Sequence, residues 1–432
     1  MTDPTAAGPR PEPLHRLRPA ASAIRPARVE PAAELGHGIW MSEGLSNSYL
    51  IATDAGRVIV NTGMGFEGPI HRHNFDAVDA SPTTCIVLTQ GHYDHVGGVD
   101  TFLERGTDVV AQANFWIWRD DNERLEAFRT RNAAFAWIDA IMAALEHARQ
   151  LGDPRDRAGG QAAGQSRPQP TITFDEQLVL ERGGRRFELR SVPGGETTDA
   201  LVVWMPDERV LFSGNLFGPL FGHVPNLVTI RGDRYRDALA YVDSLQLVLD
   251  LHPDTLITGH FEPVHGAELI ADEVQRLQES TRYVHDRTVE GMNAGLDVHT
   301  LMREIRLPAD LDVGEGYGKV SWNARAIWEN YAGWFHHRST TELYDQPPLA
   351  VAPDVVAAAG ADALVDAARA HLDAGDAVGA LHLTDLVLAA APEHPGARAT
   401  AVAAHEHLLD ASDNFWERAW LTRAVTRLRE GS

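Results

Sequence analysis

The chain has 432 residues, and 44% of them are hydrophobic, which is enough to fill the cores of two or three domains. The formal net charge of −23 at pH 7 opposes contact with a phosphate backbone, so we expect no nucleic acid among its substrates or partners. The single cysteine excludes an internal disulfide, and no apolar run approaches the roughly 20 residues that span a bilayer, so we expect a cytoplasmic protein without a membrane span.

The first part of the chain divides into a polar segment and a β-rich segment. Residues 1–33 are rich in proline, alanine and arginine and lack an apolar run, which predicts a disordered tail. Residues 36–60 contain β-branched runs separated by the turn residues Asp54-Ala55-Gly56, a pattern that predicts strands joined in a hairpin.

A cluster of potential metal ligands follows the next predicted strand. The apolar run Ile86-Val87-Leu88 indicates a buried strand, and four polar residues come after its end: Gln90, His92, Asp94 and His95. Imidazole and carboxylate groups suit zinc and similar transition metals. Alternate residues that leave a strand can point into one pocket, while the adjacent Asp-His pair serves a second ion. The spacing therefore predicts a site for two metal ions.

Helical and strand patterns alternate in the segment that follows. Residues 114–150 predict an aromatic-rich helical insertion, whose apolar face either lines a substrate channel or belongs to the core. Residues 171–211 predict a second β region. Three further potential ligands lie at a turn or after predicted strands in this half: Glu196, Asn215 and His260.

These motifs resemble those of a known protein family. The run Gln90-Gly91-His92-Tyr93-Asp94-His95 resembles the His-x-His-x-Asp-His signature of the metallo-β-lactamase superfamily, with glutamine in place of the first histidine. A glutamate where Glu196 lies, in place of the usual histidine, is characteristic of the alkyl sulfatases in that superfamily. Residues 226–233 are similar to the alkyl sulfatase stretch that holds the sulfate group, and residues 317–335 are similar to the helix that begins the dimerisation domain.

The resemblance implies an α/β fold followed by a helical domain. Residues 34–275 would form a metallo-β-lactamase αββα sandwich, and residues 276–432 would form an all-helical, tetratricopeptide-like dimerisation domain. Helices of this kind cannot bury their faces alone, so a homodimer is expected. The sterol-carrier-like domain of many alkyl sulfatases is not expected, because the chain stops at Ser432.

The resemblance also implies a set of metal ligands. Two zinc ions per chain are expected, with iron as the alternative metal, and seven residues would hold them: Gln90, His92 and Glu196 the first ion, Asp94, His95 and His260 the second, and Asn215 near both. Asp94 and His260 would also be catalytic. One of the two sites is expected to be weak, because Gln90 and Asn215 are amides where the family has a histidine and a glutamate.

Three residues are expected to contact the substrate. Asn226 and Arg231 would hold its anionic group, Arg231 through a bidentate fork, and a surface salt bridge is the alternative for this arginine. His223 would either line the pocket or take a structural role.

Together these residues predict a metal-dependent hydrolase of the alkyl-sulfatase type, a sulfuric ester hydrolase. Metal-activated water would cleave a sulfate or related ester that is small and anionic or amphiphilic. The amides Gln90 and Asn215 leave open a second hypothesis, a metal-dependent lyase or oxygenase of specialised metabolism. A non-catalytic dimeric scaffold with a decayed site is the third hypothesis.

Overall fold

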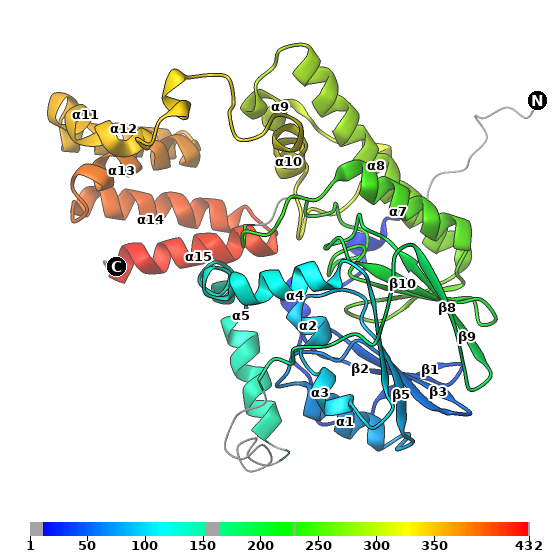
Figure 1. Cartoon of the computed structure of the whole chain (residues 1–432). Coiled ribbons are helices and arrows are strands. Elements are labelled where there is room, and N and C mark those ends of the chain that lie inside the picture. Colours follow the sequence, from blue (N-terminus) through cyan, green and yellow to red (C-terminus); the bar gives the residue numbers. More distant parts are fainter. Residues whose placement is uncertain (1–11, 150, 152–163, 228–229, 431–432) are drawn as a thin grey trace, which may run out of the picture. The chain divides into compact units, whose positions relative to one another are not determined.

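A computed structural model describes residues 12–149, 151, 164–227 and 230–430 of the chain (Figure 1). The chain forms two compact units, Met1–Tyr331 and Ala332–Ser432. The first unit contains both β-sheets, and the second contains only helices and short 3-10 turns. This organisation confirms the expected αββα sandwich followed by a helical domain.

The first sheet combines a meander with a parallel segment. Its seven strands are hydrogen-bonded in chain order: β1 (Ala33–Gly36), β2 (Ile39–Ser42), β3 (Ser48–Thr53), β4 (Gly56–Val60), β5 (Thr83–Val87), β6 (Asp108–Gln112) and β7 (Ile172–Phe174). Neighbours from β1 to β4 are antiparallel, and neighbours from β4 to β7 are parallel. The parallel strands therefore end at the same edge of the sheet.

The second sheet is mostly antiparallel. Its six strands are β8 (Gln177–Arg182), β9 (Arg185–Ser191), β10 (Leu201–Met205), β11 (Val210–Gly214), β12 (Thr255–Thr258) and β13 (Val264–His265), in the spatial order β13-β12-β11-β10-β9-β8. Only β11 and β12 run parallel, so their carboxyl ends lie side by side.

Alternating side chains of each strand bury two different layers of the core. Val58 and Val60 of β4 belong to the cluster that packs between the two sheets, together with Phe212 of β11. Ile59, between them in the sequence, belongs to the cluster under α1 (Gly68–Asp76) and α3 (Val99–Phe102), which contains Phe75. This period of two, with both faces buried, is the reason that Val58, Ile59 and Val60 are apolar at successive positions.

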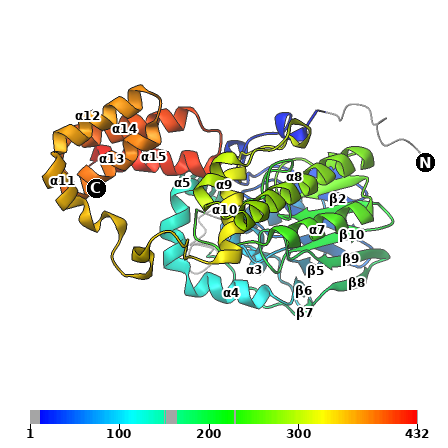
Figure 2. The same ribbon diagram turned by 90° about the horizontal axis from the view of Figure 1, so that it is seen from above.

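Two long helices cover the other side of the sandwich. Helix α7 (Ala238–Leu251) packs along α8 (Ala267–Asn293), and α8 also contacts β12 and β13. Figure 2 shows these two helices side by side over the second sheet. Together with α9 (Val298–Glu304) and α10 (Val320–Ala332), they extend the first unit to Tyr331. The expected boundary of the metal domain is residue 275.

The N-terminal segment corrects one expectation. Residues 12–33 were assigned to a disordered tail, but they contain the 3-10 turns Leu14–Arg16 and Ala21–Ala23. The backbone N–H of Leu14 donates to Glu273 over 3.2 Å, and that of Ala27 donates to the buried carboxylate of Glu67 over 2.8 Å. The prediction was wrong for this part because a proline-rich composition does not reveal hydrogen bonds to distant carboxylates. Residues 1–11 lie outside the described residues.

The second unit contains five α-helices among its described residues: α11 (Ala352–Ala359), α12 (Ala361–Asp373), α13 (Ala377–Ala390), α14 (Pro395–Asp410) and α15 (Phe415–Glu430). Successive helices pack on one another, and buried alanines such as Ala368, Ala380 and Ala404 allow close approach. Asp376 caps α13 by accepting a hydrogen bond from the Gly379 N–H over 2.8 Å.

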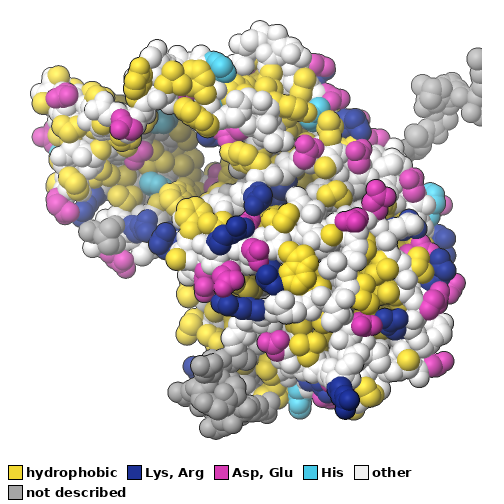
Figure 3. All heavy atoms as spheres, viewed as in Figure 1, with side chains coloured by type: hydrophobic (Ala, Val, Ile, Leu, Met, Phe, Trp, Pro, Cys, Tyr) yellow, Lys and Arg dark blue, Asp and Glu magenta, His cyan; other side chains and the backbone are white. Residues whose placement is uncertain are grey.

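Among the described helices, none alone is long and apolar enough to cross a bilayer. Only the consecutive segments Pro348–Ala359 and Ala361–Asp373, bent by 103°, reach that length and composition together. On the face drawn in Figure 3, acidic and basic side chains are interspersed rather than separated into large patches.

Candidate metal centre

The candidate ligands come from loops that follow the strands of both sheets. The loop after β5 leads into the short helix α2 (Tyr93–Val96) and carries four of them. Glu196 lies between β9 and β10, Asn215 directly follows β11, and His260 lies two residues after β12. The chain passes close to Asn215 at Gly259, which has no side chain. A Cβ atom at residue 259 would lie only 2.2 Å from Oδ1 of Asn215. The ends of the two sheets therefore meet at the site.

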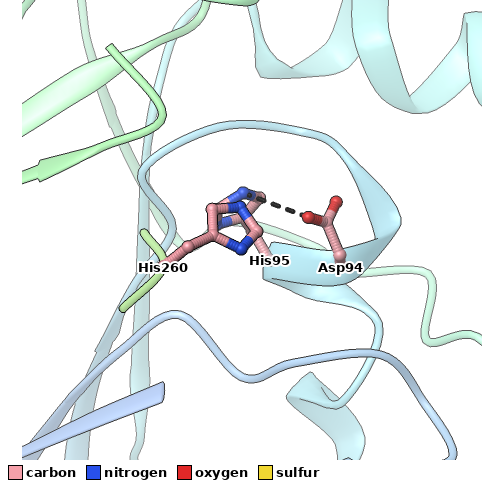
Figure 4. Close-up of side chains that lie close together, drawn as sticks. All are labelled: Asp94, His95 and His260. Carbon is pink, nitrogen blue, oxygen red and sulfur yellow. Dashed lines mark ion pairs between the residues drawn. The ribbon is translucent and has the colours of Figure 1, made fainter. Parts of the chain in front are cut away.

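Asp94, His95 and His260 form the tightest part of the site. One ligand atom from each lies within 4.8 Å of the others, and this is the one cluster of three or more such groups among the described residues. The Nε2 atom of His95 is 3.4 Å from Oδ2 of Asp94. Figure 4 shows the three side chains converging, two from the α2 segment and one from the loop after β12.

The protonation states of this trio suit a metal ion. Burial lowers the pKa of His95 to about 4 and also lowers the pKa of His260, so both imidazoles are neutral at neutral pH. Burial alone would raise the pKa of Asp94, but the neighbouring His95 holds it below its ordinary value. Neutral imidazole and ionised carboxylate are the forms that bind metals.

A second layer of side chains orients His95. Its Nδ1 atom lies 2.9 Å from Nδ2 of Asn61 and 3.1 Å from Oγ of Ser46. Asn61 is itself fixed, because its Oδ1 atom accepts hydrogen bonds from the backbone N–H and the hydroxyl of Thr89. These contacts aim the opposite ring nitrogen, Nε2, toward Asp94.

The other four predicted ligands also lie together. Nδ1 of His92 lies 3.1 Å from Nε2 of Gln90 and 3.6 Å from Oε2 of Glu196. Asn215 donates to the same Glu196 oxygen over 3.2 Å. The structure therefore brings all seven residues to one place. This half of the site contains only one histidine and one carboxylate, and the remaining donors are amides.

Carboxylates surround His92 on both sides. Its Nε2 atom lies 3.4 Å from Oδ2 of Asp233, opposite the contact with Glu196. Burial alone would lower the pKa of His92, but the hydrogen bonds with Asp233 and Glu196 raise it above the ordinary value. The contact of Nε2 with Asp233 would orient the ring and leave Nδ1, which faces Glu196, available to a metal.

Sequence reasoning missed three charged residues of the site: Arg129, Asp233 and Arg236. Arg236 donates to Glu196 over 3.3 Å and to the backbone oxygen of Asn226 over 2.7 Å. The sequence signal was the density of charge in Arg231-Gly232-Asp233-Arg234-Tyr235-Arg236, a run that begins inside the recognised stretch 226–233 and continues beyond it. Which of these charges reach the site depends on tertiary packing.

A cavity of about 290 Å³ opens beside the metal ligands. Asp94, Glu196 and His260 line one part of it, and Arg231 lines it as well. Helix α5 (Glu126–Arg149) supplies an apolar wall that includes Trp137 and Ile141. Helix α4 (Phe115–Arg124) instead buries Phe115 and Trp118 in the protein interior. The aromatic insertion therefore contributes both to the cavity and to the core.

Two predicted substrate contacts do not line this cavity. The Nδ1 atom of His223 accepts a hydrogen bond from the Gly316 N–H over 2.9 Å, and its ring lies 5.7 Å from that of His15. These contacts favour the structural role for His223. Asn226 is buried beside the cavity, and its backbone oxygen is bonded to Arg236.

Comparison with family models gives two matches. A model of the metallo-beta-lactamase superfamily matches residues 41–260. A model described as alkyl sulfatase dimerisation matches residues 298–431. The two matches are consecutive in the chain and together include every candidate metal ligand and all the helices of the second unit.

Several curated proteins are similar over most of the chain. A linear primary-alkylsulfatase from a Pseudomonas species is 27% identical, and the alignment covers 88% of this chain and 73% of that protein. An alkyl/aryl-sulfatase from Saccharomyces cerevisiae is 26% identical, with 81% and 56% covered. An (R)-specific secondary-alkylsulfatase from Pseudomonas is 25% identical, with 89% and 60% covered. The chain thus spans little more than half the length of the second and third of these relatives.

Among solved structures, the stereoselective inverting sec-alkylsulfatase from Pseudomonas superposes with a TM-score of 0.79. The sequence identity is 23%, and the match covers 93% of this chain and 66% of that one. A double mutant of the sec-alkyl sulfatase gives a TM-score of 0.80. At this identity the likeness establishes the fold.

Proposed function

We propose that this chain, which belongs to the metallo-beta-lactamase superfamily, is a metal-dependent hydrolase that cleaves sulfate esters. The observation that carries the proposal is the convergence of Asp94, His95 and His260 at a cavity that also has an arginine and an apolar wall. The similarity to several alkylsulfatases supports the choice of ester.

The residues present fit a divalent metal. The polar atoms of the site that are buried without a hydrogen-bond partner include Nε2 of His95, Oε1 of Gln90 and Oδ1 of Asn215. Such atoms are costly to bury unless another group satisfies them, and all three are competent metal donors. A bound divalent ion supplies Lewis acidity and lowers the pKa of a water molecule toward neutrality.

We assign the ligands to two zinc ions of unequal affinity. Asp94, His95 and His260 would hold the stronger ion, because they offer two neutral imidazoles and a carboxylate. Gln90, His92 and Glu196 would hold the weaker ion, with Asn215 near both. An amide oxygen is a poorer donor than imidazole, and this half of the site contains two amides, Gln90 and Asn215.

Residues of the chain position the ester and the attacking water. Asp94 and His260 line the cavity, so they are assigned contact with the reacting groups as well as with the metal. The ionised Asp94 accepts a hydrogen bond from water and thereby orients it. The Arg231 guanidinium is suited to the anionic sulfate group, and Trp137 and Ile141 exclude water from an alkyl chain. Water and the ester yield the alcohol and sulfate.

The substrate assignment is tested with linear alkyl sulfates of increasing chain length. We expect sulfate release, with kcat/KM rising roughly fourfold for each methylene that enters the cavity, because burying a methylene contributes about 0.8 kcal/mol. Ile141→Ala should weaken this dependence, whereas Ile138→Ala, on the exposed side of the same helix, should preserve it. Absence of sulfate release from every chain length would contradict the proposal.

The amide ligands favour one alternative, a metal-dependent lyase or oxygenase. Gln90 and Asn215 replace an imidazole and a carboxylate with neutral oxygens, which suits a site of one ion or of iron. Iron in the purified protein, combined with no hydrolysis of any ester, would favour this alternative. A decayed scaffold is disfavoured because the three donors of the stronger site remain together.

We also propose that the protein is a homodimer. The match to the alkyl sulfatase dimerisation model supports this, and the second unit exposes large apolar side chains, among them Trp334, Leu343 and Tyr344. Contiguous exposed apolar surface commonly marks an interface. Light scattering on the full chain should give twice the 47.3-kDa mass of one chain, and a monomer at micromolar concentration would contradict the assignment.

A further inference from the structure

The carboxylate of Asp233 lies at the centre of the positive charge beside the cavity. Its Oδ1 atom is 3.3 Å from Nη2 of Arg129, and its Oδ2 atom is 3.4 Å from Nη2 of Arg231 and 3.9 Å from Nη2 of Arg236. Nε2 of His92 lies 3.4 Å from the same Oδ2 atom. The Asp233 side chain is only 4% exposed, so solvent does little to screen these contacts.

This arrangement offsets much of the positive charge that the arginines present to an incoming anion. Arg129, Arg231 and Arg236 all lie within ion-pair distance of Asp233, and Arg236 also pairs with Glu196. Asp94 and Glu196 are already assigned to metal ions, whereas Asp233 is not. The contacts of Asp233 are those that an external oxyanion would make with the same guanidinium groups.

We propose that Asp233 is an internal counter-anion that occupies the position of the substrate's sulfate group and must be displaced before a sulfate ester binds. The inference rests on the proposed function, because it identifies the residue that sets the affinity of that same site for anions. A carboxylate and a sulfate both present oxygens to a guanidinium fork, so the two compete for Arg231. Asp233 therefore lowers the affinity of the site for anions such as free sulfate.

The test compares sulfate binding by the full chain, purified without chelator, and by its Asp233→Asn variant. Asparagine keeps the size of the side chain and removes its charge. We expect the dissociation constant for inorganic sulfate, measured by calorimetry, to fall about tenfold or more, because a like charge a few ångströms away is removed. Asp254→Asn is the matched control, because Asp254 pairs with the exposed Arg209, does not line the cavity and carries the same charge.

A second measurement guards against loss of folding in the variant. Sulfate should raise the thermal unfolding temperature of Asp233→Asn more than that of the wild type or of Asp254→Asn, since it restores the missing counter-charge. Unchanged or weaker sulfate binding by Asp233→Asn, with no such added stabilisation, would overturn the inference.

The outcome separates this inference from the proposed function. Tighter sulfate binding by Asp233→Asn supports the counter-anion even in a protein that hydrolyses no sulfate ester. Sulfatase activity in the wild type, combined with no gain in sulfate affinity in the variant, overturns the counter-anion and leaves the proposed function in place.

Discussion

Replacing His95 by alanine is expected to remove the more strongly held metal ion and to lower kcat/KM for a sulfate ester by more than about 100-fold. The loss should exceed that caused by replacing a residue that only hydrogen-bonds to a metal ligand, which reaches about 100-fold. The substitution deletes a fully buried, neutral imidazole whose Nε2 atom faces Asp94. Two donors, Asp94 and His260, would remain, and two protein ligands rarely retain zinc. Elemental analysis of the purified variant and steady-state kinetics measure the two effects.

The control for this variant is His265→Ala. His265 is an exposed histidine on β13, bonded to Thr255, in the same sheet as the strand that precedes His260. Its replacement should leave metal content and rate unchanged. Thermal unfolding of both variants separates loss of metal from loss of folding. Full metal content and full activity in His95→Ala would exclude the assigned trio as the metal site.

A Gln90→His substitution is expected to strengthen the weaker site, with the affinity for the second ion rising by at least about tenfold. Gln90 is fully buried, and its Nε2 atom lies 3.1 Å from Nδ1 of His92, so a side chain of similar size at this position reaches the same space. Imidazole is a stronger donor to zinc than an amide oxygen. Competition with a chromophoric chelator measures the affinity of each ion separately.

The matched control is Gln177→His, an exposed position at the start of β8. It adds a histidine to the same chain without approaching the site. If Gln90→His binds the second ion no more tightly than Gln177→His does, then Gln90 does not occupy a ligand position and the weakness of that site has another origin.

The strongest site residues were predictable because their signals are local. His92, Asp94 and His95 follow an apolar strand within a few residues, and His260 follows another. Polar side chains at strand ends are typical of sites, but β5 and β12 belong to different sheets, and only the packing of the two sheets brings their ends together. The alternation of Val58, Ile59 and Val60 could not specify which sheet or helix covers each face, because periodicity identifies faces and not partners.

The missed residues depend on contacts between distant parts of the chain. Arg129 lies in helix α5 and Asp233 in a loop 104 residues later, and nothing in either segment alone indicates that they pair. The sequence left His223 with two alternatives, a pocket role and a structural role, and its contacts with the backbone of Gly316 and the ring of His15 favour the structural one. Charge pairing of this kind is fixed by the packed fold, so only the structure reveals it.

The extension of the first unit beyond residue 275 also depends on contacts between distant parts of the chain. Helix α8 has a pronounced apolar face that includes Ile270, Val274 and Leu277, and this face is buried in the unit that contains α7. A helical pattern alone does not tell whether such a face packs on a sheet, on another helix or on a second chain. The division of the chain into units therefore followed from the contacts of α8 rather than from its sequence.

The most direct measurement of metal-dependent sulfate ester hydrolysis is the rate of sulfate release before metal removal, after it, and during stepwise return of zinc. We predict that protein shown by elemental analysis to hold no metal releases no sulfate, and that activity returns as zinc fills the site of Asp94, His95 and His260. Full activity in the metal-free protein would contradict the account.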